Sequence, residues 1–332
     1  MKLSEHETET LLRESLERRA ARAPDGHEVR NALARASQRR PRARLALIGV
    51  TAAVVVIFAG AAIGTQVLTS SEEPAPTPEA AAAGLVLGYT PGWLPDGFTE
   101  QYRETGPGTT PQIRRWFGDT GDTGEVALSA YSTADPAWSQ TALRIASLPD
   151  QTLVHGRVGM VTGATGTTAL LTWMADDRHV LTAQVTGVPD ARAVAQRIAE
   201  SVTAKAVAIH GELRFGSLPA GLRPLSTATY GTSPGDGGSE VKAYDPARPP
   251  APAVRASVSA HAPTAGAAPV RVRGLDGFFL AGAGDDSMVT VRLPSGRWLT
   301  VAGRQPRDVL VAVADAVALD PAPDYRWLGR AP

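Results

Sequence analysis

The spacing of apolar and polar positions divides the chain into stretches of different character. A run without any charged residue extends from residue 45 to residue 68. Apolar residues before it recur every three or four positions, which predicts helices. After residue 86, short apolar runs are separated by turns rich in Gly, Asp and Pro, which predicts β-strands. We therefore expect an α+β fold class, with one N-proximal transmembrane helix followed by a tandem repeat of antiparallel sheet plus helix.

The uncharged run at residues 45–68 has the length of a membrane span. At about 1.5 Å per residue, a helix of this length covers roughly 36 Å, against a hydrocarbon core of about 30 Å. A cleaved signal peptide has a shorter leader and an apolar run of about 7–15 residues. A leader of residues 1–44 fits that pattern poorly, so the sequence predicts an uncleaved signal anchor in a single-pass membrane protein.

Charges on either side of this run predict its orientation. Glu72 and Glu73 follow it, whereas basic side chains precede it. The positive-inside rule places the basic side in the cytoplasm. We therefore expect a cell-membrane protein with a cytoplasmic N terminus and an extracytoplasmic C-terminal region. The topology-determining residues are Arg39, Arg40, Arg42 and Arg44.

Gly60 and Gly64 form a small-xxx-small pair within the predicted span. Such pairs allow two helices to approach closely, so these residues are a candidate transmembrane dimer contact and a homodimer is one hypothesis. The same spacing also arises by chance in a segment rich in Gly and Ala, and both interpretations stay open.

The predicted cytoplasmic arm, residues 1–44, is expected to contain two short helices. Ser4 and Glu7 fit a capping box, and Leu12 and Leu16 continue at helical spacing. An arm with so few large apolar residues cannot bury a core of its own. Either it docks on a cytoplasmic protein partner, or it is a solvated leader that only sets the orientation of the span.

A Pro/Ala-rich linker at residues 69–85 leads to an internal repeat, which predicts two extracytoplasmic units at 86–208 and 209–332. Four blocks recur in the same order at offsets between 115 and 124, so chance is a poor explanation. Each unit should end in a helix that covers its sheet. The matching blocks are Trp93–Phe98 with Ser217–Leu222, Val154–Gly159 with Val272–Gly277, Leu170–Met174 with Met288–Arg292, and Val194/Ile198/Val202 with Val309/Val313/Val317.

These blocks carry a resemblance. The Leu-Pro-x-Gly opening at Leu94–Gly97, the Val-x-Gly block at Val154 and the closing helix Arg197–Val202 resemble extracytoplasmic domains of bacterial membrane-anchored regulators. These include anti-sigma-like proteins and envelope-stress regulators, and the whole layout resembles actinobacterial single-pass membrane proteins. The resemblance implies a non-enzymatic envelope sensor or protein-interaction module that regulates a sigma-factor-like cytoplasmic partner. A zinc-binding anti-sigma arm would need cysteines, and the sequence has none.

The net charge differs between the N-terminal arm and the remainder of the chain. The total of 33 basic and 33 acidic side chains hides an arm with 11 basic and 7 acidic groups, net +4, and a remainder with net −4. A neutral total argues against nucleic-acid binding. The absence of cysteine excludes thiolate metal sites, disulfides and cysteine nucleophiles.

The sequence motifs that could support catalysis lack the local features that catalytic sites require. Gly231–Gly235 matches G-x-S-x-G, but Pro234 has no N–H to donate to an oxyanion. Only His155 and His179 fall inside repeated strand blocks, and isolated strand histidines usually pack or face solvent. We therefore assign no catalytic, cofactor-binding or metal-binding residues and expect no cofactor. Two alternatives stay open: a ligand- or polymer-binding domain with a Trp-lined groove, and an enzyme that uses His155 or His179 beside an acid.

Overall fold

The computed structural model describes residues 85–118, 124–145, 150–248, 252–261, 268–282, 286–320 and 323–331. All of them belong to the second of two units into which the chain divides, Glu73–Pro332. Within these ranges the chain forms eighteen β-strands, three α-helices and one 3-10 helix.

The predicted α+β class is wrong, because the described part is mainly β. Its three α-helices have 10, 11 and 10 residues, whereas fourteen strands share one antiparallel sheet. Short helices cover only part of such a sheet, and strand-to-strand hydrogen bonds provide most of the regular structure.

The predicted single-pass membrane protein with a signal anchor is also not supported. None of the helices in the described ranges is long and apolar enough to cross a membrane. The predicted span at residues 45–68 and the arm at residues 1–44 lie outside the described residues.

Two sets of elements follow each other along the chain in the same order. Repeat 1 is defined here as Val86–Ala208 and repeat 2 as Leu213–Leu319. Repeat 1 contains β1 (Val86–Pro91), β2 (Phe98–Thr105), β3 (Gln112–Gly118), β4 (Glu125–Ser132), α3 (Pro136–Ile145), β5 (Gln151–Val154), β6 (Arg157–Thr162), β7 (Thr168–Met174), β8 (His179–Thr186), α4 (Ala191–Ser201) and β9 (Val202–Ala208).

Repeat 2 has the same succession of strands, and its described residues contain no counterpart of α3 between the fourth and fifth strands. It contains β10 (Leu213–Phe215), β11 (Arg223–Tyr230), η2 (Pro234–Asp236), β12 (Gly238–Tyr244), β13 (Pro252–Ser259), β14 (Ala268–Val272), β15 (Leu275–Leu280), β16 (Ser287–Arg292), β17 (Trp298–Gly303), α5 (Arg307–Ala316) and β18 (Val317–Leu319).

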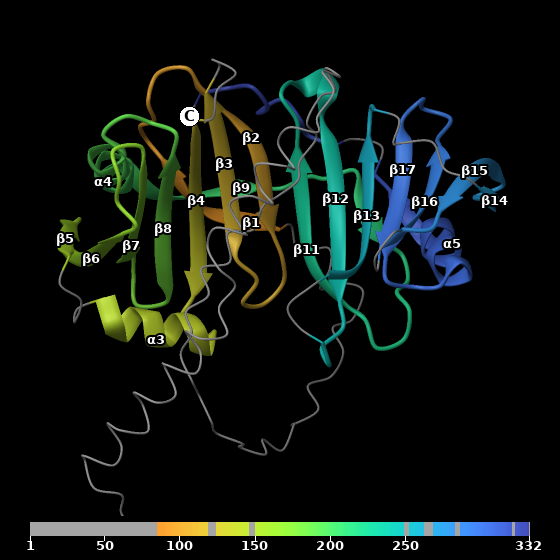
Figure 1. Cartoon of the computed structure of the whole chain (residues 1–332), viewed down its shortest axis with the longest axis horizontal. Helices are drawn as coiled ribbons and strands as arrows, with labels where there is room; N and C mark the ends of the chain where they lie inside the picture. Colours follow the sequence, from red (N-terminus) through yellow and green to blue (C-terminus); the bar gives the residue numbers. More distant parts are fainter. Residues whose placement is uncertain are drawn as a thin grey trace, which may run out of the picture. The chain divides into compact units, whose positions relative to one another are not determined.

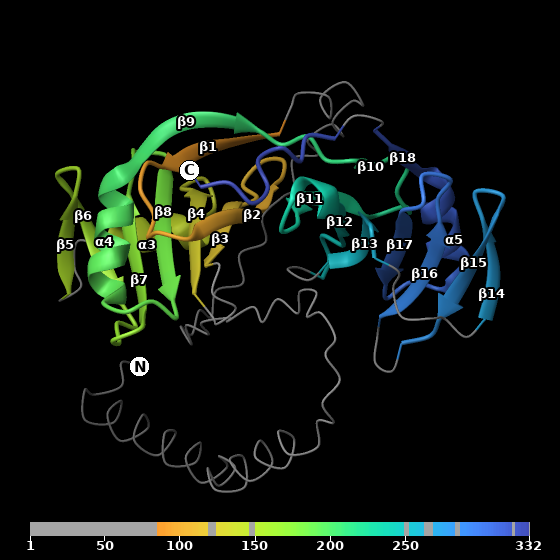
Figure 2. The same ribbon diagram turned by 90° about the horizontal axis from the view of Figure 1, so that it is seen from above.

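The strand order of the large sheet is symmetric about its centre (Figure 1). Its order is β14-β15-β16-β17-β13-β12-β11-β2-β3-β4-β8-β7-β6-β5, so corresponding strands lie at equal distances from the centre. The two halves join edge to edge where β11 pairs antiparallel with β2. Two smaller pairs, β1-β9 and β10-β18, lie outside it, and Figure 2 shows β1 and β9 running along the side of the sheet that α4 occupies.

Corresponding tight turns show that the repeat extends to local backbone conformation. His155 and Gly156 connect β5 to β6 with φ of 49° and 76°, and Arg273 and Gly274 connect β14 to β15 with 53° and 74°. Two successive positive φ values are typical of the type I′ turn, which matches the twist of antiparallel strands. This block is the Val-x-Gly block of the sequence repeat.

The helices at the ends of the two repeats cover equivalent faces. In repeat 1, Ile198 of α4 packs with Trp116, Trp173 and Leu181 in one core cluster. In repeat 2, Leu310 of α5 packs in a second cluster with residues that include Val289, Val291, Leu299 and Val301. Of the predicted stripes, Ile198 and Val313 lie on the buried sides of the helices, Val202 and Val317 are buried in the strands that follow, and Leu310 rather than Val309 is buried in α5.

The additional helix α3 lies on the opposite face of repeat 1. Its apolar residues Trp138 and Ile145 pack in a separate cluster that contains Met160 and Val180. Val161 and Leu181, the next residues in the same strands, belong to the cluster under α4. Because successive side chains of a strand point to opposite faces, repeat 1 is covered on both faces.

We expect Ile145→Ala to destabilise the protein strongly. Ile145 is 1% exposed, and the same substitution in packed cores costs about 2–5 kcal/mol of unfolding free energy. Leu143→Ala on the same helix is the matched control, because Leu143 is 78% exposed and should change stability little. Urea unfolding measures both, and equal effects would show that α3 is not packed against the sheet.

Candidate interaction surface

The joint between the repeats carries a buried ion-pair cluster on the face of α4. The Glu100 carboxylate lies 2.8 Å from Arg103 Nη2 and 2.6 Å from Arg114 Nε. All three side chains are less than a tenth exposed. Burial by itself raises the pKa of Glu100, but the hydrogen bonds and charges of the two arginines outweigh it and lower the pKa.

The C-terminal segment that follows repeat 2 contacts this cluster. The Arg103 guanidinium lies 4.0 Å from the ring centroid of Trp327. The backbone of Glu100 donates to Arg330 O and accepts from Gly329 N, both at 3.0 Å. The cluster therefore joins β2 and β3 of repeat 1 to the end of the chain.

The opposite face of the joint holds a second polar cluster around Glu104. Its carboxylate accepts hydrogen bonds from Lys242 Nζ at 2.8 Å and Ser226 Oγ at 2.5 Å, and also from the Tyr102 hydroxyl. Burial raises the pKa of Glu104, but the Lys242 charge and these hydrogen bonds outweigh it, so the pKa is lowered. Lys242 and Ser226 belong to repeat 2, so this cluster fastens the two repeats directly.

Tyr89, Asp176 and His179 form the arrangement closest to an acid–base site. Tyr89 donates to Asp176 Oδ2 at 2.6 Å, and His179 Nδ1 lies 3.0 Å from both carboxylate oxygens. Burial raises the pKa of Asp176, but these hydrogen bonds and one from the Arg178 N–H outweigh it and lower the pKa to about 2. No nucleophile is hydrogen-bonded to His179 among the described residues, so the cluster stabilises the β7–β8 turn.

The other singled-out residues do not converge on a site. His155 lies in the exposed turn between β5 and β6. The G-x-S-x-G segment runs into the short 3-10 helix η2 rather than an α-helix. Metal-binding groups of three or more His, Asp or Glu are absent from the ranges that the structure describes. The predicted dimer contact Gly60/Gly64 and the topology-determining arginines, Arg39, Arg40, Arg42 and Arg44, lie outside those ranges.

The six tryptophans do not line a common groove. Trp116 and Trp173 are buried in the core of repeat 1. The others have separate neighbours: Trp93 lies under Arg197, Trp138 stacks on Tyr131, Trp327 lies under Arg103, and Trp298 lies in β17. The Trp-lined groove expected from the ligand-binding alternative is therefore not formed by these residues.

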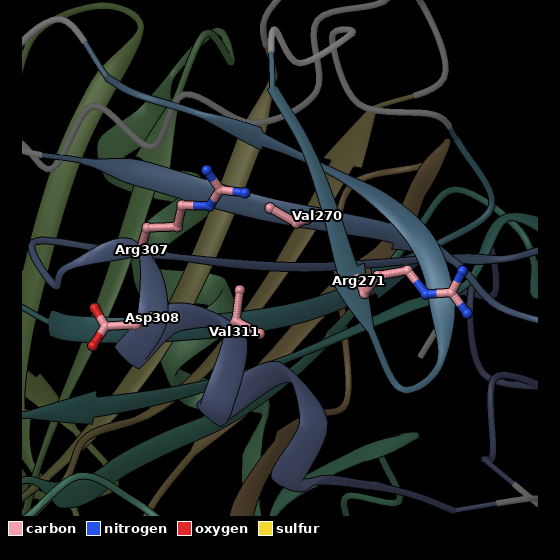
Figure 3. Close-up of a pocket in the computed structure, with 5 residues that line it drawn as sticks. All are labelled: Val270, Arg271, Arg307, Asp308 and Val311. Atoms are coloured by element: carbon pink, nitrogen blue, oxygen red, sulfur yellow. The ribbon is translucent and has the colours of Figure 1, made fainter.

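A hollow of about 430 Å³ lies between β14 and α5, lined by Val270, Val311 and three charged residues. Arg307 donates to Pro269 O at 2.8 Å, and Arg271 pairs with Asp276 at 3.0 Å. Figure 3 shows the Arg307 and Arg271 guanidinium groups and the Asp308 carboxylate pointing in different directions. Convergent polar groups of a catalytic site are not present there.

A partly exposed apolar surface lies on repeat 2, on the face of the sheet away from α5. We call it the open patch. Phe278 is 44% exposed, and the next residue, Phe279, packs in the cluster under α5. The same alternation places the other members on the face that Phe278 occupies. The open patch comprises Phe278, Leu280, Met288 and Trp298.

The equivalent face of repeat 1 is covered. Phe278 and Trp298 correspond to Met160 and Val180 at the repeat offset of 118, and these two residues are 8% and 0% exposed beneath α3. None of the described residues of repeat 2 forms a helix at this position. One sheet face therefore occurs twice in the described part of the chain, once under α3 and once with no described helix over it.

Sequence reasoning missed the open patch and both clusters at the joint. Pairs such as Glu104 and Lys242 are 138 positions apart, and no local pattern connects them. The alternation in Gly277–Leu280 could have suggested a strand with apolar residues on both faces. It could not reveal which face a helix covers.

Comparisons with known proteins add a distant structural similarity. No protein-family model matches the sequence, and no curated protein matches it. Among solved structures, the chain is similar to one described as the crystal structure of MucB in complex with MucA(peri). The identity is 18%, the match covers 68% of this chain and 94% of that chain, and the TM-score is 0.23. The predicted resemblance thus stands only in this coarse form, too distant to assign a function.

We expect Glu100→Gln to destabilise the protein, since breaking a buried ion pair costs about 3–5 kcal/mol of unfolding free energy. The substitution removes the carboxylate that forms ion pairs with Arg103 and Arg114, both of which are buried. Asp150→Asn is the control, because its pair with Arg192 is about half exposed and exposed pairs contribute little. Denaturant unfolding of both variants measures the difference, and a neutral Glu100→Gln would contradict a structural role for the cluster.

The contribution of Glu100 to the free energy of unfolding should depend on pH, and the direction of its pKa shift sets the sign. Its folded pKa lies below the usual 4.5, so its stabilisation is complete above that pH and is lost as the pH falls through the folded value. The stability gap between the unsubstituted chain and Glu100→Gln should be constant from about pH 7 to 5 and narrow below about pH 4. Unfolding curves across this range measure the gap, and a gap that widens on acidification would show the opposite linkage.

Proposed function

We propose that residues 85–331 act as a protein-interaction module, and that the open patch of repeat 2 is the surface that binds the partner. One observation carries the proposal: Phe278 is 44% exposed, whereas its counterpart Met160 in repeat 1 is 8% exposed beneath α3. Exposed apolar side chains gathered on one face mark interaction sites more often than scattered ones do.

The module is proposed to work by binding rather than by catalysis. The ionisable groups nearest to one another, at the joint and in the β7–β8 turn, are engaged in ion pairs and hydrogen bonds within the protein. Their arrangement supports a rigid scaffold. The extracytoplasmic location stays a prediction that rests on the charges beside the uncharged run, and the regulation of a sigma-factor-like partner stays a prediction that rests on the sequence resemblance.

A photocrosslinking phenylalanine analogue at position 278 tests the proposal in cells that make the full chain. We expect one discrete protein adduct, because the analogue retains the aromatic ring of Phe278, which is 44% exposed in the open patch. The same analogue at position 143 is the control, since Leu143 is more exposed but lies on the outer side of α3. Adduct formation at 278 should be lost when Met288→Asp adds a charge to the patch.

Two results would overturn the proposal. One is the absence of any protein adduct at position 278 when the folded chain is present. The other is the same set of adducts from positions 278 and 143, which would show non-specific contact of exposed apolar groups.

A further inference from the structure

We infer that the partner presents an amphipathic α-helix, with a carboxylate positioned to pair with Arg292, and that this helix takes the place on repeat 2 that α3 occupies on repeat 1. This inference rests on the proposed function and deepens it by naming the chemistry of the partner surface. Its support comes from the molecule itself, because the two repeats provide a covered and an uncovered version of one sheet face.

Repeat 1 shows what kind of element fits this face. The residues Trp138, Ala142 and Ile145 of α3 face the sheet at positions i, i+4 and i+7, the spacing of one helix stripe. Trp138 stacks on Tyr131 of β4 with ring centroids 3.5 Å apart. A helix of 10 residues with a single apolar stripe is therefore enough to cover the face.

Repeat 2 cannot provide this helix from the same place in its chain. In repeat 1 the connection between β4 and β5 comprises residues 133–150 and contains α3. The corresponding connection between β13 and β14 comprises only residues 260–267. Eight residues do not suffice for a 10-residue helix and its two connections, so a covering helix must come from elsewhere.

The strand registers place equivalent residues at equivalent points of the two faces. Met174 pairs with Val180 in repeat 1, and Arg292 pairs with Trp298 in repeat 2. Arg292 thus occupies the position of Met174, which packs in the cluster under α3. A helix that docks on repeat 2 meets a guanidinium where α3 meets a thioether.

Arg292 is the residue from which we infer an acidic group on the partner. Its side chain is exposed, and it forms no ion pair with any carboxylate among the described residues. The neighbouring Arg255 and Arg271 each have one, with Asp286 at 3.5 Å and Asp276 at 3.0 Å. A carboxylate on the docked helix would give Arg292 the ion pair that the described residues do not provide, and such charge matching gives specificity.

An added strand is a poorer fit than a helix. The open patch lies on the face of β15, β16 and β17, whereas a strand would add at the sheet edge, β14. That edge contains Pro269, whose nitrogen has no hydrogen to donate, and Arg307 already donates to its carbonyl oxygen. The face is therefore the more accessible surface.

Fluorescence anisotropy with two labelled helical peptides tests the inference on the full chain. Both carry Trp, Ala and Ile at the spacing of Trp138, Ala142 and Ile145; one has Glu beside this stripe and the other has Lys. We expect the Glu peptide to bind at least about tenfold more tightly than the Lys peptide, a difference of about 1.4 kcal/mol. Arg292→Glu should reverse the preference.

Two further variants separate the apolar contact from the charge. Phe278→Ser should lower the affinity for the Glu peptide by about tenfold or more, since it removes a large apolar contact. Leu143→Ser is the matched control and should leave binding unchanged. Circular dichroism confirms that each variant is folded.

The outcomes distinguish the inference from the proposed function. Three results would overturn the inference of an acidic partner helix. They are equal affinity for the two peptides, no binding of the Glu peptide, and a peptide preference that Arg292→Glu leaves unaltered. If position 278 still gave its specific adduct in cells, the interaction module would stand with a partner of different chemistry. If the peptides did not bind as expected and position 278 gave no specific adduct, both the inference and the proposed function would be overturned.

Discussion

The pairing of β2 with β11 is the constraint on which the rest of the sheet depends. Four consecutive residue pairs, from Tyr102–Tyr230 to Thr105–Thr227, convert two seven-stranded halves into one sheet of fourteen strands. Polar clusters hold this joint on both faces, through Glu100 on one side and Glu104 on the other. A buried ion pair contributes little net stability, but it penalises every register in which its partners are separated. The joint therefore specifies one alignment of the two repeats.

Duplication also explains how one molecule contains both a covered and an open version of the same surface. The face under α4 and α5 is closed in both repeats because each repeat ends in its own amphipathic helix. The opposite face of repeat 1 is covered by α3, which is inserted between the fourth and fifth strands, and the described residues of repeat 2 contain no such helix. Apolar residues such as Phe278 and Trp298 thus stay partly exposed in repeat 2, and binding rather than chemistry is the function that this arrangement favours.

Local patterns anticipated much of the secondary structure of the described part. The predicted stripes around Ile198 and Val313 provide buried residues of α4 and α5. These features depend on residues a few positions apart. The α+β class was wrong because the pattern gives no measure of how many strands one sheet collects. The helix α3 was not predicted, because its residues have no counterpart among the four repeated blocks that revealed the other helices.

The sequence by itself determined the internal duplication and the helix near the end of each repeat. Recurring blocks and apolar spacing specify these features. Only the tertiary structure decided that His155 lies in a tight turn, that the repeats join edge to edge, that Glu104 meets Lys242, and that no described helix covers one sheet face of repeat 2. The physical reason is that all but the first of these features depend on contacts between residues far apart in the chain, and their energies appear only when the strands are assembled.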